Sequence, residues 1–435
     1  MRRTALTEYC ECLQHLPGYP KTGTVLQMMG SVVASRGPLC SVGESCAIES
    51  AAGGSIAGEV IGFRENVVLS MPLGSAVGIR YGDRVRTRGQ VPSLSASDAM
   101  LGRVVNAMGE PLDGGAPIAG TVKVAVEASP PRAMDRVPIR DALGCGIRAI
   151  DSFLTCGRGQ RVGIFGGSGV GKTTLIGMMT RGTSADVVVL ALVGERGREV
   201  RDFLEALGDE GRRRAVLIVS TSDESPLLRI RAALGATAMA EYFARSGKNV
   251  LLILDSLTRF AMAQREVGLA AGEPPTAKGY TPSVFSRLAR LVERAGQFKT
   301  GSITAFYTVL MEGDDQQDPI VDAVRSLLDG HIVLDRKLAT ANHYPPINIL
   351  DSLSRLMASV TASGHLRKAG QLRRMMALYQ RCEDLLRVGA YQQGSDPELD
   401  NAIAAMPVIN RFLSQLPDEQ STLENSVSAL LALPF

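Results

Sequence analysis

Hydrophobic and polar positions alternate in three different ways along the 435-residue chain. From residue 24 to 89, short β-prone runs are separated by glycine and proline turns, which is typical of a small closed barrel. From residue 141 to about residue 345, strand patterns alternate with helical ones, as in a parallel sheet covered by helices on both faces. Beyond residue 349 the apolar positions recur at helical spacing, most clearly over 368–388 and 397–416.

We therefore predict a multidomain protein with an N-terminal β-barrel at 24–92, a central α/β parallel-sheet domain at 93–345 and a C-terminal α-helical domain at 346–435. The stretch Ser93–Pro138 is rich in Pro, Gly and Ser and is interpreted as an ordered linker. Residues 1–23 begin with an amphipathic helical pattern that could dock a partner, lie on a membrane surface or pack on the protein itself. The expected barrel strands are Gln27–Val33, Cys46–Ile48, Gly58–Gly62, Val67–Met71 and Asp83–Thr87.

The stretch from Gly159 to Met179 carries the pattern G-x-x-x-x-G-K-[ST] between a β-prone run and a helical one. Glycines let backbone N–H groups turn onto phosphate oxygens, and the N-terminus of the following helix adds positive partial charge. Lys172 can then reach the β- and γ-phosphates, and the Thr173 hydroxyl can bind Mg²⁺. The predicted phosphate-binding residues are Gly166, Gly167, Ser168, Gly169, Val170, Gly171, Lys172, Thr173 and Thr174.

Acidic residues follow two apolar runs of the central domain. Asp255 comes after Val250–Leu254, and Glu195 comes after Val187–Val193. Because ligands of parallel sheets lie at the carboxyl ends of the strands, both carboxylates are expected in the cleft of the glycine loop. Asp255 would then support Mg²⁺, and Glu195 would be the general base that polarises the attacking water.

Two neighbours of Glu195 have open interpretations. Arg196 could hold the γ-phosphate or stabilise the sheet. Glu199 could orient water on Mg²⁺ or be a solvated charge on a helix face.

Composition narrows the class of protein. Apolar residues make up 45% and charged residues 21% of the chain, and the longest apolar runs are far too short to span a bilayer. Seven cysteines without a C-x-x-C pair, and four scattered histidines, suggest no zinc site. The odd number of cysteines and the predicted nucleotide loop both favour a reducing cytoplasm. The N-terminus does not read as a signal peptide. A net charge of +3 and the absence of tryptophan argue against wholesale nucleic-acid binding.

Several longer motifs resemble the rotary-type ATPase family, among them GGSGVGKTTL, VGERGREVRDF, LLILDSLTRFAMAQREVGLAAGEPP and YPPINILDSLSR. That family includes the catalytic subunits of F- and V-type ATPases and the type III secretion ATPases. The motifs GSGVGKTTLIGMM, RGREVRDF and YQQGSDPELDNAI are most similar to its flagellar protein-export branch. The similarity covers roughly residues 24–415.

The resemblance implies a RecA-like P-loop domain that hydrolyses ATP with Mg²⁺ in a homo-hexamer whose sites lie at subunit boundaries. Lys172, Thr173, Glu195, Arg196 and Asp255 match the catalytic and metal-supporting positions. Tyr344 matches the tyrosine that lies against the adenine ring, and Arg355 matches the arginine that reaches the neighbour's γ-phosphate.

The same resemblance implies several partners: a soluble regulator at the N-terminal segment, a central stalk protein, a membrane export gate and chaperone-bound export substrates. It implies a cytoplasmic protein that associates peripherally with the inner membrane at the export apparatus.

Other functions remain open at this stage. The chain could serve virulence secretion, act as an F/V-type catalytic subunit, or be a Rho-like hexameric nucleic-acid motor that uses the basic stretches Arg212–Arg214 and Arg367–Arg374. Those stretches lack neighbouring aromatic residues on which bases could stack, which favours solvated helix faces or acidic partners, and we predict no nucleic-acid partner. A non-catalytic ring subunit is disfavoured by Glu195, because such subunits of the rotary family usually carry a different residue there.

Overall fold

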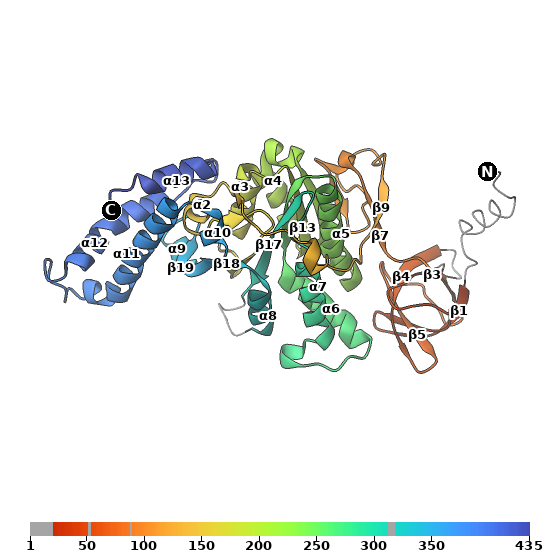
Figure 1. The fold of residues 1–435 in the computed structure, drawn as a ribbon. Coiled ribbons are helices and arrows are strands. Elements are labelled where there is room, and N and C mark those ends of the chain that lie inside the picture. Colours follow the sequence, from red (N-terminus) through yellow and green to blue (C-terminus); the bar gives the residue numbers. More distant parts are fainter. Residues whose placement is uncertain (1–20, 51–53, 88, 312–317) are drawn as a thin grey trace, which may run out of the picture.

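The computed structural model describes residues 21–50, 54–87, 89–311 and 318–435. A barrel, a central α/β domain and a bundle of C-terminal helices follow one another in a row (Figure 1). The helix expected near the N-terminus falls on residues 1–20, outside the described residues. None of the helices in the described part of the chain combines the length and apolar character that a membrane span needs.

The N-terminal strands form a closed barrel in the order β1-β2-β5-β4-β3-β6, and pairing of β1 with β6 completes it. Closure leaves no strand edge unpaired. The expected strand Gln27–Val33 is wrong, because Gly30 adopts a positive φ of 57° and the chain turns there from β1 into β2. The strands are β1 (Lys21–Met29), β2 (Val32–Arg36), β3 (Ser45–Ser50), β4 (Gly54–Arg64), β5 (Val67–Pro72) and β6 (Arg84–Thr87).

The central domain is built on a nine-stranded sheet with the order β19-β18-β12-β17-β15-β13-β14-β8, and β16 pairs with β17. The pairs from β18 through β8 in this order are parallel, whereas β19 is antiparallel to β18. The strands are β8 (Val104–Asn106), β12 (Arg161–Gly166), β13 (Val187–Glu195), β14 (Ala215–Thr221), β15 (Asn249–Asp255), β16 (Gly296–Gln297), β17 (Ser302–Leu310), β18 (Gly330–Leu334) and β19 (Ile347–Ser354).

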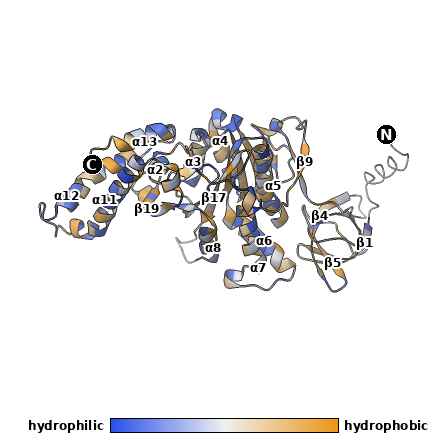
Figure 2. Cartoon of the chain, in the orientation of Figure 1, coloured by the Kyte–Doolittle hydropathy of each residue, from blue (hydrophilic) through white to orange (hydrophobic). Residues whose placement is uncertain are grey.

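Helices cover both faces of this sheet, as the hydrophobic pattern predicts. The apolar faces of α5, α6 and α7 belong to one buried cluster, and those of α3 and α4 belong to another. The apolar strands therefore lie in the middle of the domain (Figure 2). The helices are α2 (Arg148–Phe153), α3 (Lys172–Gly182), α4 (Gly197–Arg213), α5 (Pro226–Arg245), α6 (Leu257–Ala270), α7 (Pro282–Val292), α8 (Pro319–Leu327), α9 (Arg336–Thr340) and α10 (Met357–Val360).

The stretch interpreted as a linker contributes more structure than predicted. Its strands β7 (Ser93–Ala96) and β9 (Val122–Ala125) pair with each other, and β8 forms one edge of the main sheet beside β14. A strand of three residues between glycine turns is too short to be recognised from alternation alone. Smaller elements are β10 (Ala142–Leu143), β11 (Cys156–Gly157) and the 3₁₀ turns Asp98–Met100, Ala133–Asp135 and Ala277–Gly279.

The C-terminal bundle comprises α11 (Ser363–Arg387), α12 (Pro397–Leu413) and α13 (Leu423–Leu431). Buried residues of all of them pack into the same cluster that covers α3 of the central domain. The boundary expected at residue 345 cuts off β19, which is part of the main sheet up to Ser354. The helical part thus begins after this strand.

A buried ion pair joins the barrel to the central domain. Glu59 of β4 and Arg231 of α5 are 8% and 5% exposed, and Arg231 Nη2 lies 2.7 Å from Glu59 Oε2. Breaking a buried pair leaves an unpaired charge away from water, so this contact fixes the barrel against α5.

Candidate active site

The glycine loop connects β12 to α3 at the carboxyl end of the sheet. Gly169 and Gly171 have φ values of 78° and 94°, which L side chains rarely adopt, so these positions favour glycine. Gly171 is the N-cap residue of α3, and Lys172 begins the helix. The expected order of strand, loop and helix is present, with backbone N–H groups and a helix N-terminus available for an anion.

Two strand-end carboxylates lie beside this loop. In the parallel register, Asp255 of β15 is opposite Leu192 of β13, close to the end of that strand at Glu195. Asp255 is completely buried, and its Oδ1 accepts from Lys172 Nζ at 2.8 Å and from Thr308 Oγ1 at 2.5 Å. The sheet therefore brings Lys172, Asp255 and Glu195 together, as expected from the strand ends.

Each carboxylate retains one buried oxygen without a partner among the described residues, namely Glu195 Oε1 and Asp255 Oδ2. An unpaired buried oxygen is costly unless a ligand, an ion or a water satisfies it. Oxygen ligands are what Mg²⁺ prefers, and the cation usually retains several waters. The donor set therefore fits a hydrated Mg²⁺ ion beside a nucleotide.

The protonation of Glu195 depends on its surroundings. Burial, a hydrogen bond with Glu199 and the negative charge of Asp255 raise the pKa of Glu195 to about 8, against the opposing effect of Lys172. The hydrogen bond with Glu195 lowers the pKa of Glu199. The Glu195 carboxyl is thus protonated more readily than an ordinary glutamate, and the hydrogen bond between the two favours a charged Glu199.

A pocket of about 610 Å³ opens over the loop and these carboxylates. It contains most of the predicted phosphate and metal residues, whereas Gly166 and Val170 do not line it and Thr174 faces the next pocket. The predicted residues that line it are Gly167, Ser168, Gly169, Gly171, Lys172, Thr173, Glu195, Arg196, Glu199 and Asp255.

Two arginines of the same pocket were missed from the sequence. Arg259 lies on α6 and Arg336 begins α9. The position of Arg259 was an available signal: β15 ends at Asp255 and α6 begins at Leu257, so Arg259 lies in the first turn of this helix, near the carboxyl end of the strand. Arg336 had no comparable signal.

A second pocket of about 480 Å³ lies on the other side of the loop. Tyr344, 39% exposed, packs against the loop so closely that a Cβ atom on Gly171 would lie 3.4 Å from its Cε1. Pro345, Pro346 and Thr174 line the same pocket. Its apolar and aromatic walls next to the glycine loop are suited to a flat aromatic ligand such as a purine base.

The C-terminal segment supplies the remaining wall, which the sequence did not predict. The lining includes Ser414, Gln415, Leu416, Pro417 and Glu419. Gln415 N donates to Tyr344 O at 2.8 Å. The Arg148 guanidinium holds this segment through Phe412 O at 2.9 Å, through Ser414 O and through the carboxylate of Glu419.

Arg355 does not belong to either pocket of its own chain. The antiparallel register pairs the end of β19 with the start of β18, so Arg355 lies at the edge of the sheet opposite the glycine loop. The length of β18 separates these edges by roughly 15 Å. Arg355 is exposed, and its guanidinium forms no hydrogen bond or ion pair with the described residues. Within one chain, therefore, it cannot contact a nucleotide on the loop.

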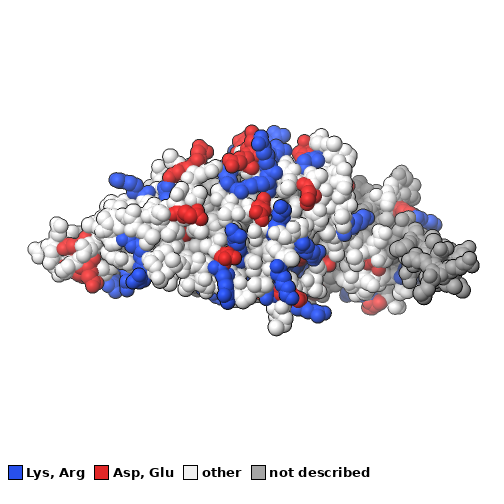
Figure 3. Space-filling model, turned by 45° about the horizontal axis from the view of Figure 1, so that its top comes forward, with Lys and Arg blue, Asp and Glu red and all other residues white. Residues whose placement is uncertain are grey.

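The basic stretches considered for nucleic-acid binding are partly engaged in the fold. Arg214 donates to the carbonyls of Thr180, Arg181 and Thr183, and Arg373 donates to Ser352 O. On the face drawn in Figure 3, acidic and basic side chains are interspersed over the central domain. This face thus presents mixed charge rather than a basic stripe.

Models of known protein families match most of the chain. The model of the ATP synthase alpha/beta family, beta-barrel domain, matches residues 25–89, and that of the nucleotide-binding domain of the same family matches 146–354. The model of the T3SS EscN ATPase C-terminal domain matches 361–432. The chain belongs to the ATP synthase alpha/beta family.

Relatives within the family are similar over nearly the full length. The flagellum-specific ATP synthase of Bacillus subtilis (strain 168) is 49% identical over 97% of this chain and 97% of that protein. The type 3 secretion system ATPase of Xanthomonas euvesicatoria is 46% identical over 94% of this chain and 93% of that protein. Among solved structures, the assembled ATPase EscN of enteropathogenic E. coli has a TM-score of 0.90 and 44% identity, with 94% of this chain and 99% of that chain covered.

As a member of the ATP synthase alpha/beta family of the flagellar and type III secretion kind, this protein is an ATP hydrolase. The fold class expected from the sequence is confirmed by the family's barrel, nucleotide-binding and C-terminal domains.

Proposed function

We propose that this chain is the Mg²⁺-dependent ATPase of a flagellar type III protein-export apparatus. The observation that carries the chemistry is the set of two strand-end carboxylates, each with an unpaired buried oxygen, beside Lys172 and the glycine loop. Among the relatives, flagellum-specific ATP synthases of three further bacteria are 47–48% identical to this chain. In this role the chain couples ATP hydrolysis to the delivery and unfolding of export substrates.

Binding of the triphosphate rests on the loop. Backbone N–H groups of the loop and the α3 N-terminus bind the phosphate oxygens, and Lys172 moves from Asp255 to the β- and γ-phosphates. Mg²⁺ would be held by the Thr173 hydroxyl and, through water, by Asp255, while Glu199 orients the water around it. When bound, the ion neutralises the negative charge that develops on the phosphate oxygens.

Glu195 prepares the attacking water. The positive charge of Lys172 lowers the pKa of the Glu195 carboxyl, and the proton of that carboxyl would pass to bulk water before the reaction. The Glu195 carboxylate then accepts a hydrogen bond from the water and takes its proton as the γ-phosphoryl group transfers. Arg196 contacts the γ-phosphate, and Tyr344 packs against the adenine ring.

The position of Arg355 supports a site shared between subunits. Because it lies away from the glycine loop of its own chain, it would complete the site of a neighbour in a closed homo-hexamer. An arginine supplied in trans stabilises transition-state charge and accelerates phosphoryl transfer by about 10³–10⁵. Support for assembly comes from the EscN ATPase, which has been solved in an assembled form and in complex with its central stalk EscO.

The same proposal includes a cytoplasmic location, peripheral to the inner membrane, and the partners of the export apparatus. These are a central stalk protein, a soluble regulator at the N-terminal segment, a membrane export gate and chaperone-bound substrates. Support for export partners comes from the C-terminal match to the T3SS EscN ATPase domain.

Biochemical and genetic experiments test this function. Glu195→Gln is expected to retain ATP binding and lose turnover, and turnover per chain in the wild-type protein is expected to rise with protein concentration as sites are completed. Expression in a flagellated bacterium that lacks its own export ATPase is expected to restore motility. Restored secretion in a virulence-system mutant, without restored motility, would instead place the chain in virulence secretion.

A further inference from the structure

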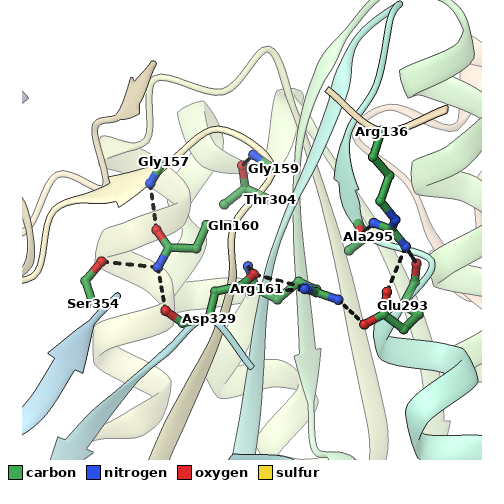
Figure 4. Close-up of polar contacts among 10 residues, drawn as sticks. All are labelled: Arg136, Gly157, Gly159, Gln160, Arg161, Glu293, Ala295, Thr304, Asp329 and Ser354. Atoms are coloured by element: carbon green, nitrogen blue, oxygen red, sulfur yellow. Dashed lines mark hydrogen bonds and ion pairs between the residues drawn. The ribbon is translucent and has the colours of Figure 1, made fainter. Parts of the chain in front are cut away.

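A cluster of buried and half-buried polar side chains lies at the start of β12, at the sheet edge opposite the glycine loop (Figure 4). Gln160, which directly precedes this strand, is completely buried. Its Oε1 accepts from Gly157 N at 2.8 Å, and its Nε2 donates to Asp329 O and to Ser354 Oγ, both at 3.1 Å. The amide thus connects the turn before β12 to both β18 and β19.

Both acceptors of the Gln160 amide adjoin Arg355. Asp329 O accepts from Gln160 Nε2 and also from the backbone N–H of Arg355 at 3.0 Å. Ser354, the residue before Arg355, donates its hydroxyl to Thr155 O at 2.9 Å. The Gln160 amide therefore contacts the side chain of Ser354 and shares with the backbone N–H of Arg355 the same acceptor, Asp329 O.

Asp329 is itself firmly positioned. Arg161, the first residue of β12, donates Nε to Asp329 Oδ2 at 2.9 Å and Nη2 to Asp329 Oδ1 at 3.1 Å. Glu293 joins Arg161 to Arg136, whose Nη2 lies 2.9 Å from Glu293 Oε2 (Figure 4). A bidentate pair of this kind fixes orientation as well as distance.

The Gln160 side chain packs closely against Gly330, the first residue of β18. A Cβ atom on Gly330 would lie 3.3 Å from Gln160 Nε2 and 2.6 Å from Leu353 O. A side chain at position 330 would therefore clash with Leu353 O and would also crowd the Gln160 amide. The Gln160 side chain therefore occupies one defined place.

We infer that Gln160 is a positioning residue for Arg355. It acts through Asp329 and Ser354 to set the direction in which the Arg355 guanidinium leaves the sheet toward the nucleotide of a neighbouring subunit. This inference rests on the proposed function, in which Arg355 completes the neighbour's site. Misplacement of a catalytic group by about 1 Å costs about 10²-fold in rate. Loss of a positioning contact can therefore slow hydrolysis even though the positioning residue does not contact the substrate.

The test begins with Gln160→Met, which keeps the length of the side chain and removes its amide. The expected result is a decrease in kcat of about 10²-fold with KM for ATP and nucleotide affinity nearly unchanged, because the variant's own glycine loop is intact. Ser354→Ala removes one of the two contacts and is expected to give a smaller decrease in kcat. It serves as the second variant if Gln160→Met does not fold.

Thr304→Ala is the matched control. Thr304 Oγ1 accepts from Gly159 N at 2.8 Å, so this variant loses a buried hydrogen bond of the same turn without touching Asp329 or Ser354. Its kcat is expected to remain close to that of the wild type. An equal decrease in kcat for Thr304→Ala and Gln160→Met would show that the turn, rather than the link to Arg355, determines the rate.

Mixed rings distinguish an effect on the neighbour from an effect on the same chain. Gln160→Met protein is mixed with Glu195→Gln protein, which lacks the general base but keeps Arg355 and its support. In a random one-to-one ring, about one interface in four pairs an intact Glu195 with a correctly held Arg355. Turnover is therefore expected to recover to the level of a parallel mixture of Arg355→Ala with Glu195→Gln.

The two mixtures separate the failure of this inference from that of the proposed function. Recovery with Arg355→Ala but none with Gln160→Met overturns the positioning role, because Gln160 would then act within its own chain. If neither mixture recovers although both form joint rings, the shared site of the proposed function is refuted and this inference with it.

Discussion

Replacing Glu195 with glutamine is expected to stabilise the nucleotide-free protein while it abolishes turnover. The carboxyl of Glu195 is 8% exposed and its pKa is raised from the ordinary value of 4.5 to about 8 by burial, by Glu199 and by Asp255. Between these two values the unfolded chain releases a proton that the folded chain retains. Stability is therefore lost as pH rises from 4.5 toward 8.

The magnitude follows from the same pKa difference. At pH 7 the solution is about 2.5 pH units above the ordinary pKa, and each unit corresponds to about 1.4 kcal/mol, so the ionisable Glu195 carboxyl costs about 3 kcal/mol. Glutamine has the shape of the protonated acid, can donate to Glu199 and cannot ionise. The free energy of unfolding should thus rise by about 3 kcal/mol at pH 7 and by under 1 kcal/mol at pH 5.

Urea unfolding of the nucleotide-free proteins at pH 5, 6, 7 and 8, followed by far-ultraviolet circular dichroism, measures this difference. Glu205→Gln is the control, because Glu205 is an exposed carboxyl on α4 and its replacement should change stability by less than about 0.5 kcal/mol. A difference between Glu195→Gln and wild type that does not grow with pH would refute the reasoning.

Three further predictions concern contacts of the structure. Lys172→Ala should abolish hydrolysis and lower the free energy of unfolding by about 3 kcal/mol, because it leaves the buried Asp255 without its cation; urea unfolding and phosphate release measure the two effects. Tyr344→Ala should raise the KM for ATP by about tenfold or more, whereas Tyr344→Phe should retain the wild-type value in steady-state kinetics. Arg231→Met should destabilise by about 3 kcal/mol by leaving Glu59 buried and unpaired, and Glu59→Gln added to it should restore much of the loss in thermal unfolding.

The sequence carried most of the information about the phosphate side of the site. A glycine loop between a strand and a helix, and acids at the ends of apolar strands, follow from local patterns, and parallel pairing brings them together. This is why Lys172, Glu195 and Asp255 could be expected in one pocket. Their roles in catalysis stay predictions that the experiments above address.

The base side of the site could not be predicted in the same way. Its wall from Ser414 to Glu419 is placed by tertiary contacts with Arg148 and Tyr344, residues far away in the chain. The strands β8 and β19 were assigned to a linker and to the helical part for a related reason. Short edge strands gain their stability from the sheet they join, not from a pattern of their own.

The wall of the second pocket directly follows α12, so the width of that pocket and the placement of the C-terminal bundle are linked. A tilt of α12 would change the width of the second pocket, and by thermodynamic reciprocity a ligand in that pocket would resist the same tilt by an equal free energy. A ligand in the second pocket and a protein bound to the C-terminal bundle would thus raise or lower each other's affinity without direct contact.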